Sequence, residues 1–508
     1  MRNMEMREPV YIDKLETGIA GFDFISDGGL PKSRVTLISG SAGSAKTVLA
    51  AQFLAEGIRR VGEGGVFVTL EESPDDIRRN MAGFGWAIED WEEQGKWAFV
   101  DASLQPGEEI AVTGSYDFGA FLARIEHAVR KVGAKRLSVD SLGAILTRLP
   151  DAATIRQEIF RIVMALKKMG VTAVLTAECP ENYDQISRFG VEEFVADNVI
   201  VLRNVLEEEK RRRTIEILKY RGAPHQKGEF PFTVLPAEGI IVIPLAEIQL
   251  EQKSSNIRIT SGNEELDELC GGGFFRDSII LVSGATGTGK TLMTAEFIAG
   301  GVKHDERCLL FAFEESREQL FRNAHGWGMN FEQMEKEEKL KVVCVYPETI
   351  GLEDHLVNME REIKSFKPNR VAVDSLSALE RVSTIKGFRE FVISLTSFIK
   401  HQEIAGLFTA TTASLMGGTS ITETHISTIT DSIILLRYVE AFGEMKRGLT
   451  VLKMRGSMHN KDIREFNIDS QGMHIGKPFR NVSGILAGNP QLLAPGEFER
   501  LRDLFPEN

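Results

Sequence analysis

The chain has 508 residues, more than one hydrophobic core organises, so two or more domains are expected. Its 43% hydrophobic and 26% charged residues are typical of a soluble globular protein, and the net charge of −13 argues against a basic surface for nucleic acid. The N-terminus is charged where a signal peptide is apolar, and no apolar run is long enough to cross a membrane. We therefore expect a cytoplasmic protein that binds neither nucleic acid nor membrane.

Four short motifs occur twice in the same order, about 240 residues apart, a period typical of a duplicated domain and not of a solenoid. The sequence therefore predicts a first domain over 1–248, a second domain over 249–485 and a C-terminal tail over 486–508. The first copies of the motifs lie at 35–47, 67–73, 137–142 and 217–222, and the second copies at 279–291, 310–316, 371–376 and 451–456.

Each copy begins with a glycine-rich loop between an apolar strand and a helix. In such a loop, glycines let backbone N–H groups surround the phosphates of a nucleotide, the lysine reaches the β- and γ-phosphates, and the following hydroxyl binds Mg²⁺. Both loops therefore predict ATP with Mg²⁺ as the ligand. The second loop fits the Gly-x-x-x-x-Gly-Lys-Thr pattern in full, through Gly284, Gly287, Gly289, Lys290 and Thr291. The first loop offers Gly40, Gly43, Lys46 and Thr47.

The first loop departs from the pattern at Ala45, where the motif has its second glycine. A methyl group in this place crowds the phosphate, or strains the backbone if φ is positive. We expect the first loop to bind nucleotide and leave its rate of hydrolysis open.

Within each copy, short runs rich in Val and Ile alternate with amphipathic helical stretches such as 48–60 and 292–302. The strands that precede the two loops, 35–38 and 279–282, have the apolar character of strands buried on both faces. These patterns predict an α/β fold, with two tandem RecA-like P-loop NTPase domains, each a mostly parallel sheet with helices on both faces.

Acidic residues follow two further apolar strands of each copy. A strand-end aspartate is the usual residue that holds Mg²⁺, and a glutamate pair can orient or deprotonate an attacking water or hydroxyl. Taken alone, the aspartates fit helix caps equally well, and the glutamates fit exposed surface charges. Their recurrence at matched distances from the loops favours the functional interpretation, with Asp140 and Asp374 as metal ligands and Glu71, Glu72, Glu314 and Glu315 as catalytic residues.

A pair of basic residues lies late in each copy, on a strand too far along the chain to join the phosphate loop. Basic side chains so placed can contact the γ-phosphate of a nucleotide on a neighbouring subunit, and the alternative is an edge strand with exposed charges. The candidate catalytic residues of this kind are Lys219 and Arg221 in the first copy and Lys453 and Arg455 in the second.

From about residue 10 to about residue 490, the chain resembles the KaiC family of circadian-clock ATPases and autokinases. The resemblance rests on the motifs above and most sharply on residues 420–431, Ser-Ile-Thr-Glu-Thr-His-Ile-Ser-Thr-Ile-Thr-Asp. In that family this segment holds an adjacent serine and threonine that are autophosphorylated, which implies Ser427 and Thr428 as phosphoacceptors here. The matching first-copy segment, 185–197, lacks the pair. Without the resemblance, both hydroxyls would be assigned to a structural loop.

The resemblance implies a double-ring homohexamer with ATP between protomers, which acts as the core of a clock or timer. The first domain would be a slow ATPase. In the second, Glu314 would be the general base, supported by Glu315, for transfer of the γ-phosphate to Ser427 and Thr428 of the next subunit. The second-domain basic pair would contact that γ-phosphate in trans, and the phosphate could return to ADP.

The partners of the family are KaiB, which binds the first-domain ring, and KaiA, which binds the C-terminal segment. The resemblance implies a KaiB-like partner on the first domain of this chain. The tail after Gly488 is shorter than the cyanobacterial tail and unlike it, which leaves a KaiA-like partner doubtful.

Two other functions fit parts of the sequence. A nucleic-acid motor or recombinase of the RecA type would carry basic loops and hydrolyse ATP faster with DNA, and the acidic composition argues against it. A non-catalytic ATP-binding ring that signals by assembly alone would not need the glutamate doublets that both copies retain. A hydrolysis assay with and without DNA tests the first alternative, and acceptor mutants test the second.

Overall fold

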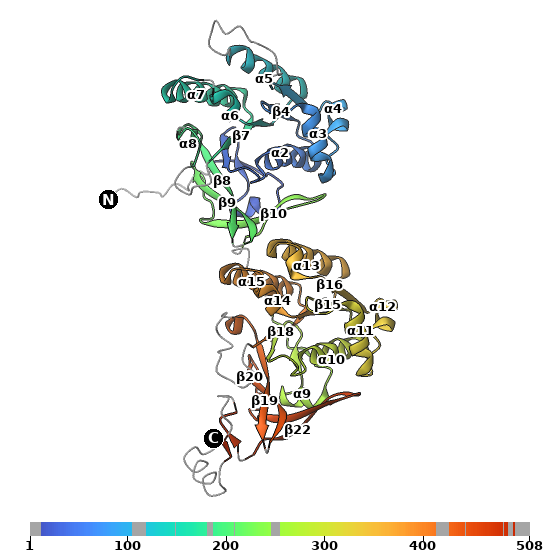
Figure 1. Ribbon diagram of the computed structural model, residues 1–508. Coiled ribbons are helices and arrows are strands. Elements are labelled where there is room, and N and C mark those ends of the chain that lie inside the picture. Colours follow the sequence, from blue (N-terminus) through green and yellow to red (C-terminus); the bar gives the residue numbers. More distant parts are fainter. Residues whose placement is uncertain are drawn as a thin grey trace, which may run out of the picture. The chain divides into compact units, whose positions relative to one another are not determined.

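A computed structural model of the chain describes residues 12–103, 118–147, 149–179, 186–190, 192–207, 209–244, 254–412, 426–441, 443–480, 482–485 and 491–492. By its internal contacts the chain divides into two compact units, Met1–Glu247 and Ile248–Asn508. Each unit is built on one large sheet that carries helices on both faces (Figure 1). In the described part of the chain, no helix has the length and apolar character needed to cross a membrane.

The sheet of the first unit has the strand order β11–β10–β9–β8–β3–β7–β6–β4–β5. The strands from β8 to β5 in this order are parallel, and β9, β10 and β11 extend the sheet with antiparallel pairing. Its strands are β3 (Val35–Gly40), β4 (Gly65–Thr69), β5 (Trp97–Asp101), β6 (Arg136–Asp140), β7 (Thr172–Glu178), β8 (Asn198–Glu207), β9 (Lys210–Tyr220), β10 (Glu229–Leu235) and β11 (Gly239–Val242), and β1 (Lys14–Leu15) pairs with β2 (Leu30–Pro31) in a separate ribbon.

Two layers of core lie on the two faces of this sheet. Because successive side chains of a strand point to opposite faces, Ile38 enters the layer beneath α2 and Leu37 enters the layer beneath α5 and α7. Every residue of β3 is buried, as its apolar sequence predicts. The helices are α1 (Phe22–Ile25), α2 (Lys46–Val61), α3 (Pro74–Met81), η1 (Ala82–Phe84), α4 (Ile88–Glu93), α5 (Phe118–Val132), α6 (Gly143–Leu146), α7 (Ala152–Met169) and α8 (Glu192–Val195).

The sheet of the second unit repeats this topology, with the order β16–β15–β17–β18–β14–β19–β20–β21–β22. The strands from β16 to β19 are parallel, and β20, β21 and β22 are added with antiparallel pairing. Its strands are β14 (Ile279–Gly284), β15 (Cys308–Ala312), β16 (Leu340–Cys344), β17 (Arg370–Asp374), β18 (Ala405–Thr411), β19 (Ser432–Ala441), β20 (Glu444–Met454), β21 (Arg464–Asp469) and β22 (Gly472–Pro478), and two short ribbons pair β12 (Arg258–Ile259) with β13 (Phe274–Phe275) and β23 (Val482–Ser483) with β24 (Gln491–Leu492).

Helices again cover both faces of the second sheet, with α10 against β15, β17 and β18, and α15 against β18. The predicted α/β fold of two RecA-like domains is thereby confirmed. The helices are α9 (Glu264–Leu269), α10 (Lys290–Lys303), α11 (Arg317–Gly326), α12 (Phe331–Lys336), η3 (Pro347–Thr349), α13 (Leu352–Phe366), α14 (Leu376–Glu380), α15 (Ile385–His401) and η4 (Ile426–Thr428).

Candidate functional site

Both phosphate loops lie at the carboxyl edge of the parallel strands, since one connects β3 to α2 and the other connects β14 to α10. Loop carbonyls hold each lysine ammonium. Lys46 Nζ donates to the carbonyls of Gly40 and Ser41 at 2.9 and 3.0 Å, and Lys290 Nζ donates to the two matching carbonyls at 3.0 Å. Burial lowers the pKa of both lysines. An anion such as a nucleotide phosphate would favour the charged form of both lysines and offset the cost of burying them.

The two phosphate loops differ at the residue just before the lysine. Gly289 has φ 106°, a backbone conformation that only glycine adopts without strain. Ala45 has φ 70° and ψ 29° in the left-handed region, which costs an alanine about 1 kcal/mol. Its side chain packs against the core beneath α2. Of the two effects expected at this position, the strained backbone is therefore the one observed.

The strand-end aspartates each accept a hydrogen bond from a threonine on the neighbouring strand, Asp140 from Thr176 and Asp374 from Thr409. Asp374 also accepts from Thr291, the hydroxyl residue of the second phosphate loop. Burial raises the pKa of Asp374, and the two hydroxyl groups oppose this shift. A cation would offset the cost of burying the Asp374 carboxylate beside Thr291. Asp374 and Thr291 therefore fit a Mg²⁺ ion that would take its other ligands from phosphates and water.

The glutamate doublets lie beside these aspartates, because β4 pairs with β6 and β15 pairs with β17 in parallel register. Each doublet is followed by a serine that caps the next helix. Ser73 accepts from the backbone N–H of Asp76, and Ser316 accepts from that of Gln319 in a full capping box. Each cap fixes the residue at which the next helix begins. The doublet just before the cap is therefore held at the carboxyl edge of the sheet.

The first glutamate of each doublet has a different partner in the two units. Ser141 Oγ donates to Glu71 Oε1 at 2.8 Å. Glu314 instead pairs with Arg381, whose two terminal nitrogens lie 3.0 Å from Glu314 Oε1. Ser375, which matches Ser141 in the repeat, keeps a buried Oγ with no hydrogen-bond partner among the described residues. The sequence analysis missed Ser141 and Arg381.

The second glutamate of each doublet has the same partner in both units. Asn80 donates to Glu72 at 2.8 Å and Asn323 donates to Glu315 at 3.1 Å. Burial is the main cause that raises the pKa of both glutamates, and the asparagine hydrogen bonds lower it. The asparagines were not predicted, although each follows its glutamate by eight residues in both repeats, a spacing that could have identified them.

Lys219 and Lys453 lie on β9 and β20, and Arg221 and Arg455 directly follow these strands, towards the amino edge of the parallel strands. Lys219 pairs with Val199 near the start of β8, and Lys453 pairs with Ile433 near the start of β19. The phosphate loop of the same unit follows the carboxyl edge of β3 or β14. The structure therefore does not bring the predicted basic residues, Lys219, Arg221, Lys453 and Arg455, together with the phosphate loop of their own unit.

The candidate acceptors lie at this same amino edge of the second sheet. Ser427 and Thr428 form most of η4, shortly before β19, and Thr428 is exposed. Asp431 anchors the segment to the first residue of β14, because its carboxylate accepts from Ile279 N at 2.9 Å. Residues 420–425 of the predicted acceptor segment lie outside the described part of the chain, as does the tail apart from 491–492.

The basic pair of the second unit is bonded to the acceptor segment. Arg455 Nη2 donates to the carbonyl of Thr428 at 2.7 Å, and Lys453 Nζ donates to the carbonyl of Thr430 at 2.6 Å. In the first unit, Lys219 Nζ donates at 2.8 Å to two carbonyls, those of Glu193 and Ala196. Lys453, Arg455 and Lys219 are thus held at the segment that leads into the strand beside the phosphate-loop strand, which is β19 in the second unit and β8 in the first.

Glycine-rich loops, lysines held by loop carbonyls and strand-end carboxylates at the carboxyl edges of two RecA-like sheets define a tandem P-loop ATPase. No cluster of three or more His, Cys, Asp or Glu side chains placed to hold a metal ion occurs in the described ranges.

Comparison with known proteins identifies the family. A family model described as "ATPase: KaiC" matches residues 15–247 and 259–479. The chain is 71% identical to the circadian clock protein KaiC3 of Synechocystis sp. over 496 residues, 98% of each chain. It is 53% identical to the circadian clock oscillator protein KaiC of Thermostichus vulcanus over 487 residues, 96% of this chain and 93% of the relative. The chain belongs to the KaiC ATPase family.

Proposed function

We propose that the chain is an autophosphorylating KaiC-type clock or timer protein. In this proposal the first domain, 1–248, is an ATPase, and the second domain, 249–485, is a serine/threonine autokinase that can also return the phosphate to ADP. Both phosphate loops bind ATP with Mg²⁺. The metal is held by Thr47 and Asp140 in the first domain and by Thr291 and Asp374 in the second.

The observation that carries the kinase proposal is the separation of acceptor and phosphate loop within one chain. Ser427 and Thr428 precede β19 at the amino edge of the sheet, whereas Lys290 follows β14 at the carboxyl edge. β14 has six residues, which corresponds to about 20 Å along the strand. This distance supports transfer from the nucleotide of one subunit to the acceptors of the next, and not transfer within a chain.

The contacts of the basic pair support the same direction of transfer. Because Lys453 and Arg455 hold the backbone of the acceptor segment, the acceptors and the two cations are presented together. A neighbouring γ-phosphate that meets the acceptors would then also meet the cations, which would stabilise its developing charge. Lys219 and Arg221 take the equivalent part in the first domain, where water replaces the acceptor hydroxyl.

The chemistry follows from the doublets. Glu314 takes the proton of the attacking Ser427 or Thr428 hydroxyl as the new O–P bond forms and the bond between the γ-phosphorus and the ADP oxygen breaks. Glu315 supports the site through its hydrogen bond with Asn323. In the first domain, Glu71 and Glu72 orient water for hydrolysis.

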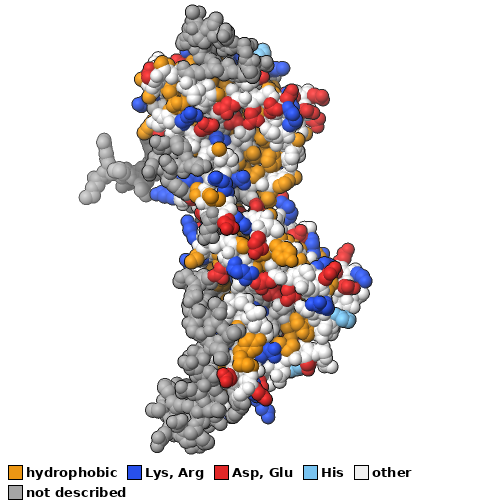
Figure 2. Space-filling view, viewed as in Figure 1, with side chains coloured by type: hydrophobic (Ala, Val, Ile, Leu, Met, Phe, Trp, Pro, Cys, Tyr) orange, Lys and Arg blue, Asp and Glu red, His pale blue; other side chains and the backbone are white. Residues whose placement is uncertain are grey.

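The assembly and the partners complete the proposal. Transfer between subunits requires an assembly of at least two chains, and we propose the double-ring homohexamer that the resemblance implies. A KaiB-like protein is the proposed partner of the first domain. On the face shown in Figure 2, basic and acidic side chains are interspersed over the described residues, a pattern that supports a protein partner more than a nucleic acid.

Mixing two inactive variants tests the transfer between subunits. Glu314→Gln keeps the acceptors but lacks the base, and the double variant Ser427→Ala/Thr428→Ala keeps the base but lacks the acceptors. With γ-labelled ATP and Mg²⁺, we expect neither protein to label alone and the mixture to label the Glu314→Gln chain, which a tag separates on a gel. Adding Lys290→Ala to the double variant is the matched control and abolishes this label. A mixture that stays unlabelled, although mixed rings form, contradicts the proposal.

A further inference from the structure

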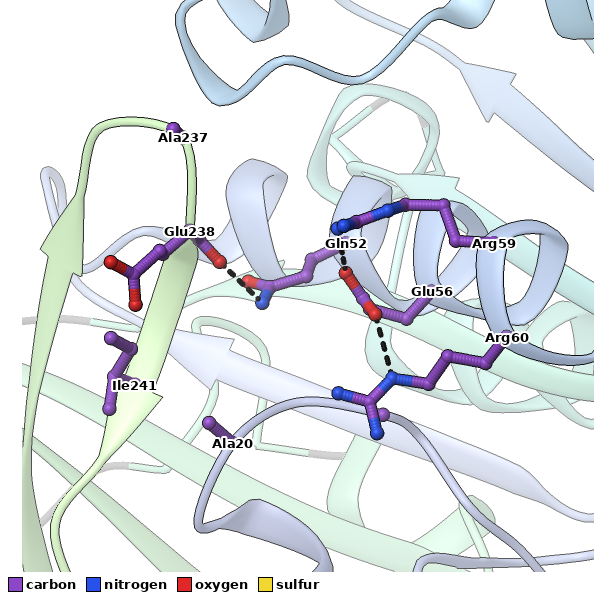
Figure 3. Close-up of a pocket in the computed structure, with 9 residues that line it drawn as sticks. Ala20, Gln52, Glu56, Arg59, Arg60, Ala237, Glu238 and Ile241 are labelled. Carbon is purple, nitrogen blue, oxygen red and sulfur yellow. Dashed lines mark hydrogen bonds and ion pairs between the residues drawn. The ribbon is translucent and has the colours of Figure 1, made fainter. Parts of the chain in front are cut away.

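A buried amide fastens the terminal hairpin of the first sheet to the phosphate-loop helix. Gln52 of α2 is 2% exposed and accepts from Ile240 N at 2.7 Å. Its Nε2 donates to the carbonyls of Glu238 and Ile240, both at 3.2 Å. Figure 3 shows Gln52 reaching from the helix towards the hairpin, where Glu238 lies in the turn and Ile241 on β11, beside a small pocket. This contact uses only a neutral side chain.

The second unit makes the matching contact with a carboxyl group. Glu296 of α10 is 6% exposed, and its Oε1 accepts from Met473 N, the start of β22, at 2.7 Å. The donor function that Gln52 has in the first unit is supplied here by Asn263, which donates to the carbonyl of Met473 at 2.6 Å and lies 3.5 Å from Glu296 Oε2. Asn263 matches Ile19 of the first repeat. The two units thus share the contact and differ in whether it can ionise.

The surroundings of Glu296 are nearly uncharged. Burial raises its pKa from the ordinary 4.5 to about 7, while the hydrogen bonds from Met473 N and Asn263 oppose the shift. The charged groups that face it are His474 of β22, which lowers the pKa, and Glu265 of α9, which raises it. His474 is itself exposed and bonded to Asp469 at 3.0 Å. Glu296 therefore changes its charge near neutral pH.

The residue that Glu296 holds also touches the second phosphate loop. A Cβ placed on Gly289 would lie 3.4 Å from Met473 Cε and 3.0 Å from Ile468 Cδ1. The backbone of Met473 is thus fastened to the middle of α10, while its side chain packs against the glycine just before Lys290. A displacement of β22 would therefore change the packing against Gly289, the residue of the second phosphate loop that has φ 106°.

We propose that Glu296 is a positioning residue whose protonation state sets how firmly β22 supports the second phosphate loop, so that nucleotide binding in this domain alone responds to pH near neutrality. The proposal rests on nucleotide binding at the second loop. Burial favours the protonated carboxyl, so the folded arrangement that holds β22 is fully stabilised below about pH 4.5. This stabilisation is lost as the pH rises through about 7, because the cost of burying the carboxylate outweighs its stronger hydrogen bonds from Met473 N and Asn263. The first domain, with Gln52 in this place, lacks the response.

The direct test is nucleotide affinity at the second loop across pH 6 to 8.5. Full-length protein with Lys46→Ala, which leaves only the second loop, is titrated with a fluorescent ADP analogue in Mg²⁺, and the same protein with Glu296→Gln is the comparison. We expect the unsubstituted Glu296 protein to lose about threefold or more in affinity, beyond any change in the Glu296→Gln protein, between the ends of this range. Parallel pH profiles of the two proteins would overturn the proposal while nucleotide binding itself stands.

A ligand-free measurement separates this inference from the proposed function. Thermal unfolding of the second domain is followed over the same pH range, and we expect Glu296→Gln to flatten its pH dependence. The reciprocal variant Gln52→Glu places a carboxyl in the first unit and should add such a dependence there, which keeps the test decisive if Glu296→Gln does not fold. Unchanged pH dependence in the folded variants would overturn the proposal, whether or not the second loop binds nucleotide.

Discussion

The two units share one topology and the same lysine and threonine at the end of each phosphate loop, and they differ in the residues around these groups. The first phosphate loop turns through a strained Ala45, and the second turns through Gly289. A serine hydroxyl holds Glu71, whereas an arginine holds Glu314. This comparison teaches that a duplicated fold can keep its reactive groups in place while their supports diverge, which is where we expect the two reactions to differ.

The largest effect that would sharpen this comparison is expected from the first glutamates. Glu314→Gln should slow second-domain phosphorylation by roughly 100- to 10,000-fold, because a positioned general base contributes about this factor. Glu71→Gln should slow ATP hydrolysis by the first domain and leave labelling of the second intact. Rates of ³²P incorporation and of ADP release in each variant measure this. Equal loss of both activities in both variants would show that the two sites are not separable.

The loop lysines give the next largest effect. Lys290→Ala should weaken nucleotide binding to the second loop by roughly 100-fold, since a charge-assisted hydrogen bond to phosphate is worth about 2 to 3 kcal/mol. Lys46→Ala should do the same at the first loop only. Equilibrium titration with a fluorescent nucleotide resolves the two sites. One site that stays filled in each variant is the expected result, and loss of both sites in one variant would contradict independent loops.

A glycine exchange tests the strain of the first loop. Ala45→Gly should stabilise the first domain by less than about 1 kcal/mol, because the added freedom of the unfolded chain offsets part of the released strain, and it should raise ATP turnover there. Gly289→Ala is the matched variant and should destabilise the second domain, because its Cβ would meet Ile468 at 3.0 Å. Urea unfolding and ADP release measure both. If the Ala45→Gly protein is less stable than the parent, backbone strain at Ala45 does not limit the stability of the first domain.

The smallest effect is expected from the ion pair of the second doublet. Arg381→Met should slow phosphorylation by about 3- to 10-fold, because Glu314 loses the group that orients it. Stability should change by less than about 1 kcal/mol, since both partners are partly exposed. Arg381→Lys, which keeps a single donor, should recover part of the rate. A large loss of stability without loss of rate would show that the ion pair between Arg381 and Glu314 has a structural role only.

The sequence predicted the features that repeat. The phosphate loops, the strand-end aspartates and the doublets could be found because each occurs twice at matched spacing, and the strands of the core could be found because they are apolar throughout. The α/β fold of two RecA-like domains followed from these patterns. The roles of the predicted site residues stay predictions.

The contacts that could not be predicted depend on chain segments far apart. Arg381 reaches Glu314 across 67 residues, and Ser141 reaches Glu71 across 70, so only the parallel pairing of the strands brings them together. The raised pKa of Glu296 likewise depends on its burial beneath β22, where its partner Met473 lies 177 residues further along the chain. Local patterns carry no information on such partners, and the asymmetry between the domains lies mostly there.

The most direct test of the central claim is autophosphorylation of the purified full-length chain with γ-labelled ATP and Mg²⁺, followed by mapping of the labelled residue. The account predicts label on Ser427 or Thr428 that disappears in the double variant Ser427→Ala/Thr428→Ala, while ATP hydrolysis by the first domain continues. Steady hydrolysis with no label on either residue would contradict it and would leave a two-domain ATPase whose second-domain hydroxyls are structural.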